Sequence, residues 1–307
     1  MEKYHVDKQL RILKPLRFKK YTKTRRLFAN LVINLTMLFT KPKRGMKKRT
    51  FIIRGYQHKK VKVYVYEIKK DESIRPGLLY IHGGGFQMEG TPVHVGMMQD
   101  MIRASKHRAV YVKYRLAPKH PFPTALMDAY HALLWMVEHS DFLKIDPKNI
   151  TLAGDSAGGN LCASVALYAR DHKGPHIKKQ LLIYPVIDVR QTSDSMKMFD
   201  DTPMWNSVLN KAMWEQYLKN GDLGMLKYAS PILADLHDMP KTYIETAEFD
   251  CLRDEAIDYA RKLESFGVPV VEYHTRRTVH GYDAVFFSRM VKRMIAHRID
   301  FLKDEAI

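Results

Sequence analysis

Short apolar runs alternate with longer amphipathic stretches along most of this 307-residue chain. The short runs are rich in β-branched and aromatic residues, which is typical of strands buried in a parallel sheet. In the longer stretches apolar residues recur every three or four positions, which predicts helices. Strands are expected at 51–56, 61–68, 78–81, 109–114, 150–153, 180–184, 242–246 and 268–273, and helices at 95–106, 125–139, 161–170, 253–266 and 284–301.

This alternation predicts an α/β fold with an eight-stranded, mostly parallel sheet flanked by helices. Two segments stand outside it, namely residues 1–49 and about 190–225. Ligands of such sheets bind beyond the carboxyl ends of the strands, so both segments are candidates for a helical cap over that edge. We therefore expect a basic helical cap segment at 1–49 and a catalytic domain at 50–307, which contains the second cap segment.

Positive charge is concentrated in the first cap segment. Residues 1–50 hold 16 Lys and Arg against Glu2 and Asp7, which accounts for +14 of the formal net charge of +18. Clustered positive charge attracts polyanions, so nucleic acid, anionic lipid and an acidic protein are all candidate partners of this segment. We favour a solvated cap surface without nucleic acid, and we keep contact with a membrane surface as the alternative.

The first cap segment also holds an apolar run at residues 27–40. The run is too short to span a bilayer, and no small-residue cleavage site follows it, so neither a membrane span nor a secretory signal is expected. Its apolar side must be covered by the body of the fold, by a second subunit in a homodimer, or by a membrane. We expect the body, with the apolar face over the pocket and the cations in solvent.

A serine motif follows the expected strand at 150–153. The residues Gly154-Asp155-Ser156-Ala157-Gly158 match G-x-S-x-G between a strand and a helix. In that context the serine lies on a sharp turn that exposes its hydroxyl, and the glycines allow strand and helix to approach closely. Ser156 is therefore the candidate nucleophile.

A second glycine-rich motif, His82-Gly83-Gly84-Gly85, follows the strand at 78–81. Three consecutive glycines at a strand end indicate a loop whose amide groups approach a ligand. We expect the N–H groups of Gly83 and Gly84, together with that of Ala157, to form an oxyanion hole.

A serine nucleophile needs a base and an acid that orients the base. Asp250 follows the strand at 242–246, and His280 follows the last strand, so both lie in loops in the order Ser, Asp, His. The rivals of Asp250 are Glu248, Asp254 and Asp258, and the rival of His280 is His274.

Further side chains are expected to contact the substrate, and some of them belong to an apolar stripe in the second cap segment. That stripe is interpreted as ordinary helix core or as the lining of an acyl pocket. Cys162 and Cys251 have no Cys or His neighbours at ligand spacing, and no dinucleotide motif occurs, so no metal and no cofactor is expected. The cysteines look unpaired, which favours a cytoplasmic location. The expected substrate-contacting residues are Phe86, Asp155, Trp205, Leu209, Tyr217 and Tyr282.

Four motifs together resemble the hormone-sensitive-lipase-type α/β-hydrolases over residues 51–300. They are the triple-glycine motif, the serine motif, Tyr114-Arg115-Leu116-Ala117-Pro118 with His120-Pro121-Phe122-Pro123, and Asp250-Cys251-Leu252-Arg253-Asp254-Glu255. The resemblance implies an α/β-hydrolase fold with an N-terminal helical cap and an esterase with Ser156, Asp250 and His280 as its triad. Two positions depart from the pattern: Lys119 stands where Glu is usual, which removes a structural ion pair, and Cys251 stands where Pro is common.

The expected function is a cofactor-free serine carboxylesterase that cleaves acetyl or other short acyl esters of small molecules through an acyl-enzyme. The acyl chains are expected to have about two to six carbons, because bulky aromatic residues stand in the second cap segment. An amidase or deacetylase with the same triad is the first alternative. A ligand-binding or membrane-surface protein on the same scaffold is the second.

Overall fold

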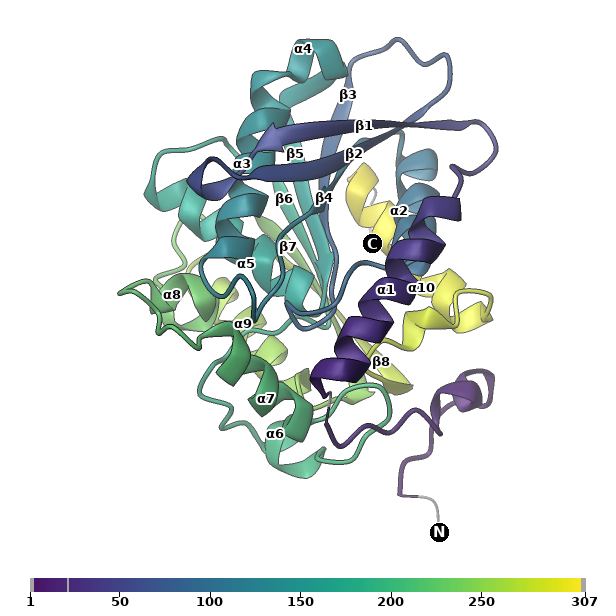
Figure 1. Ribbon diagram of the computed structural model, residues 1–307, viewed down its shortest axis with the longest axis vertical. Helices are drawn as coiled ribbons and strands as arrows, with labels where there is room; N and C mark the ends of the chain where they lie inside the picture. The colour runs from purple at the N-terminus through teal and green to yellow at the C-terminus, as the bar shows by residue number, and fades with distance from the viewer. Residues whose placement is uncertain (1–2, 21, 305–307) are drawn as a thin grey trace.

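A single eight-stranded sheet forms the centre of the molecule (Figure 1), in the order β1-β2-β4-β3-β5-β6-β7-β8. The structure is a computed structural model, and it describes residues 3–20 and 22–304. β2 runs antiparallel to β1 and β4, and the other neighbours are parallel, which confirms the predicted mostly parallel sheet. The strands are β1 (Met46–Arg54), β2 (Lys60–Ile68), β3 (Arg75–Ile81), β4 (Arg108–Lys113), β5 (Ile145–Asp155), β6 (Lys179–Ile183), β7 (Lys241–Phe249) and β8 (Val270–Val279).

Helices cover both faces of the sheet. On one face α2 (Pro92–Ser105) packs against α10 (Arg289–Lys303), and on the other α3 (Thr124–Glu138), α5 (Ala157–Asp171) and α9 (Arg253–Ser265) lie against the strands (Figure 1). The remaining helical elements are η1 (Lys8–Leu13), α1 (Lys23–Phe39), η2 (Tyr56–His58), α4 (Ser140–Leu143), α6 (Asp194–Met198), α7 (Ser207–Tyr217), α8 (Leu226–Ala229), η3 (Pro231–Leu233) and η4 (Tyr282–Ala284).

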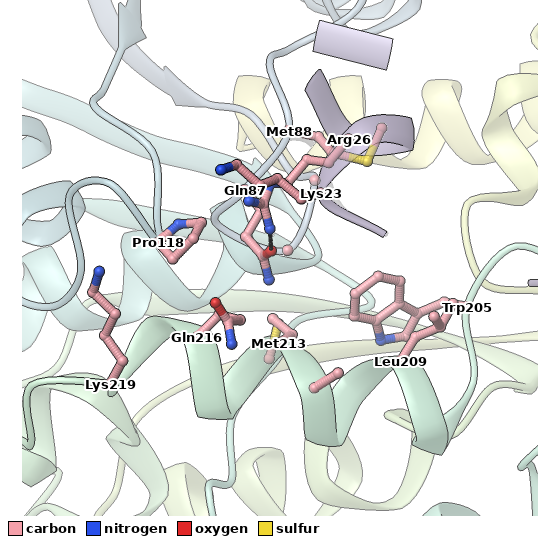
Figure 2. A pocket seen from close by; sticks show the side chains of 13 residues that line it. Lys23, Arg26, Gln87, Met88, Pro118, Trp205, Leu209, Met213, Gln216 and Lys219 are labelled. Atoms are coloured by element: carbon pink, nitrogen blue, oxygen red, sulfur yellow. Dashed lines mark hydrogen bonds between the residues drawn. The ribbon is translucent and has the colours of Figure 1, made fainter. Parts of the chain in front are cut away.

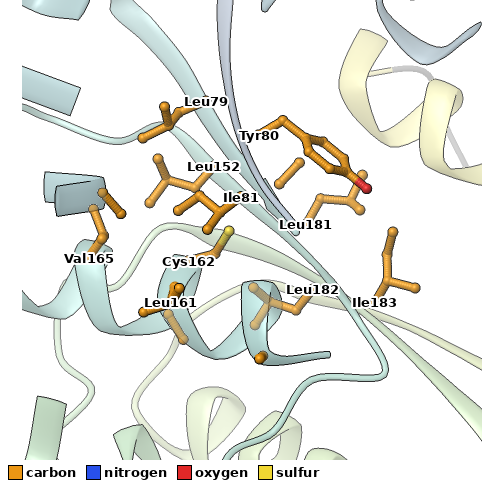
Figure 3. Close-up of a cluster of buried hydrophobic side chains, with 14 of the residues drawn as sticks. Leu79, Tyr80, Ile81, Leu152, Leu161, Cys162, Val165, Leu181, Leu182 and Ile183 are labelled. Atoms are coloured by element: carbon orange, nitrogen blue, oxygen red, sulfur yellow. The ribbon is translucent and has the colours of Figure 1, made fainter. Parts of the chain in front are cut away.

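The core around α5 holds the central strands and this helix together. Leu152 of β5 and Leu182 of β6 face Leu161 and Val165 of α5, and all four side chains are fully buried (Figure 3). Burial of an aliphatic side chain of this size stabilises a fold by about 1.5–3 kcal/mol. The strand–turn–helix unit that carries Ser156 is therefore anchored on both sides of its turn.

Several element boundaries differ from the expected ones: β5 begins at Ile145 instead of residue 150, and β8 ends at Val279 instead of residue 273. The starts of β1 and α10 differ as well. β1 begins at Met46 instead of residue 51, because the cations that look like loop residues are strand residues paired with the buried Glu67, for example Arg49 at 2.8 Å. α10 begins at Arg289 instead of residue 284. The side chain of Ser288 caps it by accepting a hydrogen bond from the backbone N–H of Val291.

The two segments outside the strand–helix alternation pack against one another. The side chain of Lys3 lies 2.7 Å from Asp201, and the amide of Asn206 donates to the backbone oxygen of Phe18 at 2.9 Å. The backbone N–H of Met204 donates to the oxygen of Leu16 at 2.7 Å. The N-terminal segment and the β6–β7 connection therefore form one continuous layer.

Helix α1 is turned the opposite way from the expected one. Its inner face bonds to the body through polar groups: Asn30 donates to the backbone oxygen of Gln87 at 2.9 Å and accepts from the N–H of Glu89 at 2.9 Å. Its outer face is apolar and exposed, with Phe28 at 66% and Leu38 at 77%. The expectation that the body buries the apolar face of this run is wrong, because the loop beneath it offers polar partners.

No helix within residues 3–20 and 22–304 combines the length and the apolar character needed to cross a membrane. Cys162 and Cys251 are both buried and unpaired.

Candidate active site

Ser156 sits on a strained turn between β5 and α5. Its backbone has φ 54° and ψ −121°, a conformation that side chains other than glycine rarely adopt. Strand β3 and helix α5 can approach closely because residue 158 is a glycine: a Cβ there would lie 2.0 Å from the backbone oxygen of Ile81. The serine motif therefore forms the sharp elbow that its sequence context predicts.

The structure brings Ser156, His280 and Asp250 into one chain of hydrogen bonds. His280 Nε2 lies 2.9 Å from Ser156 Oγ, and His280 Nδ1 lies 2.7 Å from Asp250 Oδ2. Asp250 is fully buried, and the other two are exposed by 7% or less. This arrangement can transfer the hydroxyl proton to the imidazole while the carboxylate holds the ring in the required tautomer.

The rival residues are engaged elsewhere. Glu248 accepts from the backbone N–H of Arg277 at 2.6 Å, and Asp254 accepts from that of Ser195 at 2.7 Å. His274 lies in β8, as its strand-like context suggests, and its Nδ1 is 2.8 Å from Thr246 Oγ1. Asp258 lies in α9, with Arg261 3.4 Å away.

The glycine loop differs from the expected oxyanion hole by one residue. The N–H of Gly83 donates to Asp155 Oδ1 at 3.2 Å, so it is already used and cannot also bind an oxyanion. Gly84 and Gly85 follow with positive φ and line the cavity beside Ser156. The N–H of Ala157 opens helix α5, where it has no carbonyl partner within the helix. Gly83 is thus replaced by Gly85 as a candidate donor, together with Gly84 and Ala157.

Asp155 holds this loop through three groups. Besides Gly83, its carboxylate accepts from Tyr80 Oη at 3.2 Å and lies 3.1 Å from His94 Nε2. Burial raises the pKa of Asp155, but the charge and hydrogen bond of His94 outweigh it and hold that pKa below its usual value. For His94, burial lowers the pKa, and Asp155 outweighs it and raises that pKa. Asp155 therefore positions the loop, and it also lines the cavity that contains Ser156.

His82 braces the same loop. Its ring stacks on Tyr114 with 4.3 Å between centroids, and its Nδ1 lies 2.7 Å from the oxygen of Gly83. Burial lowers the pKa of His82 to about 3, so the ring is neutral at physiological pH. His82 is suited to structural support and not to proton transfer.

Two neighbouring cavities lie along the glycine loop. The catalytic cavity, of about 310 Å³, contains Ser156 and His280, and its lining combines apolar side chains such as Val93 and Met97 with the carboxylates of Glu89, Asp155 and Asp283. The middle cavity, of about 490 Å³, is lined by Leu209 and Met213 of α7 and opens toward α1 (Figure 2). Gly84, Gly85, Met88 and Trp205 line both cavities and form the boundary between them.

Three expected substrate contacts are wrong. Phe86 is fully buried and stacks on Tyr217 with 3.7 Å between ring centroids, so both rings support the loop from behind. Tyr282 is also fully buried, and its hydroxyl donates to Glu245. Trp205 and Leu209 do line a cavity, as expected. Met88 and Met97 were not predicted as lining residues, whereas Met213 belongs to the apolar stripe for which the lining of a pocket was one interpretation.

Within residues 3–20 and 22–304, no group of three or more His, Cys, Asp or Glu side chains could hold a metal ion.

The comparisons with known proteins agree with this geometry. A family model of the alpha/beta hydrolase fold matches residues 78–284. The chain belongs to the hormone-sensitive-lipase-type α/β-hydrolases. It is 37% identical to "Esterase LipI" of Mycobacterium tuberculosis over 69% of this chain and 67% of that protein. It is also 30% identical to arylacetamide deacetylase of Bos taurus, over 80% of this chain and 77% of that protein.

Among solved structures of this family, that of a bacterial heroin esterase superposes with a TM-score of 0.88. The two sequences are 31% identical, and the superposition covers 98% of each chain. The likeness therefore extends over nearly the whole chain, beyond the residues that the family model matches.

Proposed function

We propose that this α/β-hydrolase is a serine carboxylesterase. The observation that carries the proposal is the chain of hydrogen bonds from Ser156 through His280 to Asp250. Ser156 Oγ attacks the ester carbonyl while His280 takes its proton, and His280 then donates that proton to the leaving alcohol. A water molecule activated by His280 releases the acid and restores the free serine.

The oxyanion of both tetrahedral intermediates is bound by backbone N–H groups of Gly84, Gly85 and Ala157. Their fixed orientation stabilises the transition state without reorganisation. The catalytic cavity lies at the lower end of the size range of ligand sites, which supports acyl chains of about two to six carbons. Higher catalytic efficiency on dodecanoyl than on butanoyl esters would contradict this range.

Ser156→Ala tests the nucleophile. We expect this variant to fold like the wild type and to lose measurable ester hydrolysis, because no other group can form the acyl-enzyme. An organophosphonate should add its mass to Ser156 alone, as peptide mass spectrometry can verify. Labelling at another serine, or substantial turnover by the variant, would refute the assignment.

Asp250→Asn tests the orienting acid. The amide cannot hold the reactive tautomer of His280, so we expect kcat to fall by about four orders of magnitude. Glu248→Gln is the matched control, because Glu248 is close in sequence but bonds to Arg277. A loss of less than tenfold in Asp250→Asn would contradict the triad as assigned.

A deacetylase acting on N-acyl bonds is the second candidate, favoured by the similarity to arylacetamide deacetylase. Phenyl acetate and acetanilide form a matched pair that separates the two functions. An esterase is expected to cleave phenyl acetate with a much higher kcat/KM than acetanilide, whereas comparable values would identify a deacetylase.

We also propose a cytoplasmic location, supported by the two unpaired cysteines.

A further inference from the structure

A third hollow, the basic groove, continues the path away from Ser156. It measures about 660 Å³ and shares Lys23, Arg26, Gln87, Pro118 and Lys219 with the middle cavity. The middle cavity in turn shares the glycine loop with the catalytic cavity. A ligand that reaches from Ser156 through the middle cavity therefore arrives among the side chains of the basic groove.

The basic groove contains many more cations than carboxylates. Lys113 lies 3.1 Å from Glu89, and Arg115 lies 2.7 Å from the buried Asp128, so these two cations are neutralised. Six further cations have no carboxylate within 4 Å among the residues that the structure describes. They are Lys23, Arg26, Lys60, Lys62, Lys119 and Lys219.

These six cations come from distant parts of the sequence. Lys23 and Arg26 belong to the basic N-terminal segment, but the other four belong to the remainder of the chain, which carries only +4 of the net charge. Figure 2 shows Lys219, just after α7, facing Lys23 and Arg26 of α1 across the middle cavity. Like charges gathered around a hollow repel one another, so an anion that enters the hollow relieves this repulsion.

The apolar part of the catalytic cavity's lining assigns the two halves of an ester. An acyl chain is apolar and suits the side of Val93 and Met97. The alcohol half then points the other way, across Gly85 and Met88 into the middle cavity, which Gln216 and Lys219 line.

We propose that the preferred substrates are short acyl esters of an anionic alcohol, whose phosphate or carboxylate binds between Lys23, Arg26 and Lys219. This inference rests on the proposed esterase function and deepens it. Lys119, which departs from the family pattern, contributes to the same positive field at the rim of the groove. Because the lysines are solvent-exposed and Arg26 is half-buried, the contribution of each cation is modest and the preference is sensitive to salt.

A matched pair of substrates tests the proposal: 1-acetylglycerol and 1-acetylglycerol 3-phosphate. They share the scissile bond and differ in the anion. We expect kcat/KM to be about tenfold higher for the phosphate ester at low ionic strength, chiefly through KM, and the ratio to approach one at about 0.5 M salt. A ratio near or below one at low salt would overturn the proposal.

The double variant Lys23→Gln/Lys219→Gln locates the anion. In this variant the ratio of kcat/KM for the phosphate ester to that for the neutral ester should fall toward one. Lys211→Gln is the control and should keep the wild-type ratio. Lys211 is exposed on α7, the helix that lines the middle cavity, but it lines none of the three hollows. A preference for the phosphate ester that survives the double variant would also overturn the assignment.

A binding measurement separates this proposal from the proposed function. Glycerol 3-phosphate should raise the melting temperature of the wild type and of Lys211→Gln more than that of the double variant. If neither ester is cleaved but this shift is seen, the esterase function fails and the anion site stands. If the esters are cleaved at equal rates and no shift is seen, the anion site fails and the esterase stands.

Discussion

At the scale of single residues, Asp155 connects the nucleophile's turn to the loop that faces the substrate. It precedes Ser156 in the chain, yet its carboxylate holds the N–H of Gly83 and the ring of His94. This use of Gly83 moves the candidate oxyanion donors to Gly84 and Gly85. The sequence could not reveal the shift, since three consecutive glycines look alike until the partner of each amide is known.

The ion pair of His94 and Asp155 predicts a pH dependence of stability. The pKa of His94 in the folded protein is raised above its ordinary value of 6.5. The stabilisation is therefore complete below pH 6.5 and is lost as the pH rises through the folded-state value. We expect His94→Gln to lower the free energy of unfolding by about 1.5–3 kcal/mol near pH 6, and by less near pH 9.

Denaturant unfolding of both proteins at about pH 6, 7.5 and 9 measures this difference. The depressed pKa of Asp155 acts in the opposite direction only at acidic pH, where its carboxylate becomes protonated. A difference between wild type and variant that grows as the pH is raised across this range would show that the pair does not stabilise the fold.

At the scale of elements, two helices contain glycines that differ in their surroundings. Gly158 of α5 lies against the backbone of β3, whereas a Cβ at Gly96 of α2 would meet no atom within 4 Å. Both glycines are helical, and the serine motif predicts a close approach at Gly158 but has no counterpart at Gly96. The packing partner of each helix decides whether a methyl group is harmful or useful.

Gly158→Ala and Gly96→Ala should therefore have opposite effects. A Cβ at 158 would lie 2.0 Å from the backbone oxygen of Ile81, which forces β3 and α5 apart and is expected to cost about 3 kcal/mol and most of the activity. Gly96→Ala should stabilise the protein by about 0.5–1 kcal/mol, because alanine is the better helix former. Melting temperatures that fall equally in both variants would contradict this account.

Element types were more predictable than the depth at which side chains lie. Each expected strand core lies within or overlaps an observed strand, because a short apolar run between turn residues is typical of a strand buried on both faces. Phe86, Tyr217 and Tyr282 resemble pocket residues in the sequence, since an aromatic side chain near a catalytic motif has the same pattern whether it faces substrate or core. The basic groove also escaped prediction, because its lysines are scattered from residue 23 to residue 219.

At the scale of the whole molecule, α1 exposes an apolar face between two clusters of cations. Leu31, Leu35 and Phe39 are 57%, 48% and 80% exposed, and they continue the row of Phe28 and Leu38. Exposed Lys and Arg flank the helix on both sides, and no Asp or Glu occurs between Asp7 and Glu67. Apolar residues framed by cations match the interface of an anionic membrane, in which a helix lies parallel to the surface.

We therefore expect the full chain to bind vesicles of phosphatidylglycerol and phosphatidylcholine, and to bind pure phosphatidylcholine much more weakly. Binding should weaken at about 0.5 M salt, since screening removes the electrostatic part of the attraction. Leu31→Glu/Leu38→Glu should lose most of the binding in a sedimentation assay, because carboxylates on the apolar face are repelled by the headgroups and are poorly solvated among acyl chains. Ile74→Glu is the matched control, since Ile74 is 71% exposed in the loop between β2 and β3. A different result would contradict this prediction: the wild type does not bind anionic vesicles but is a dimer, and the double variant is a monomer. The apolar face would then be an interface with a second copy of the chain.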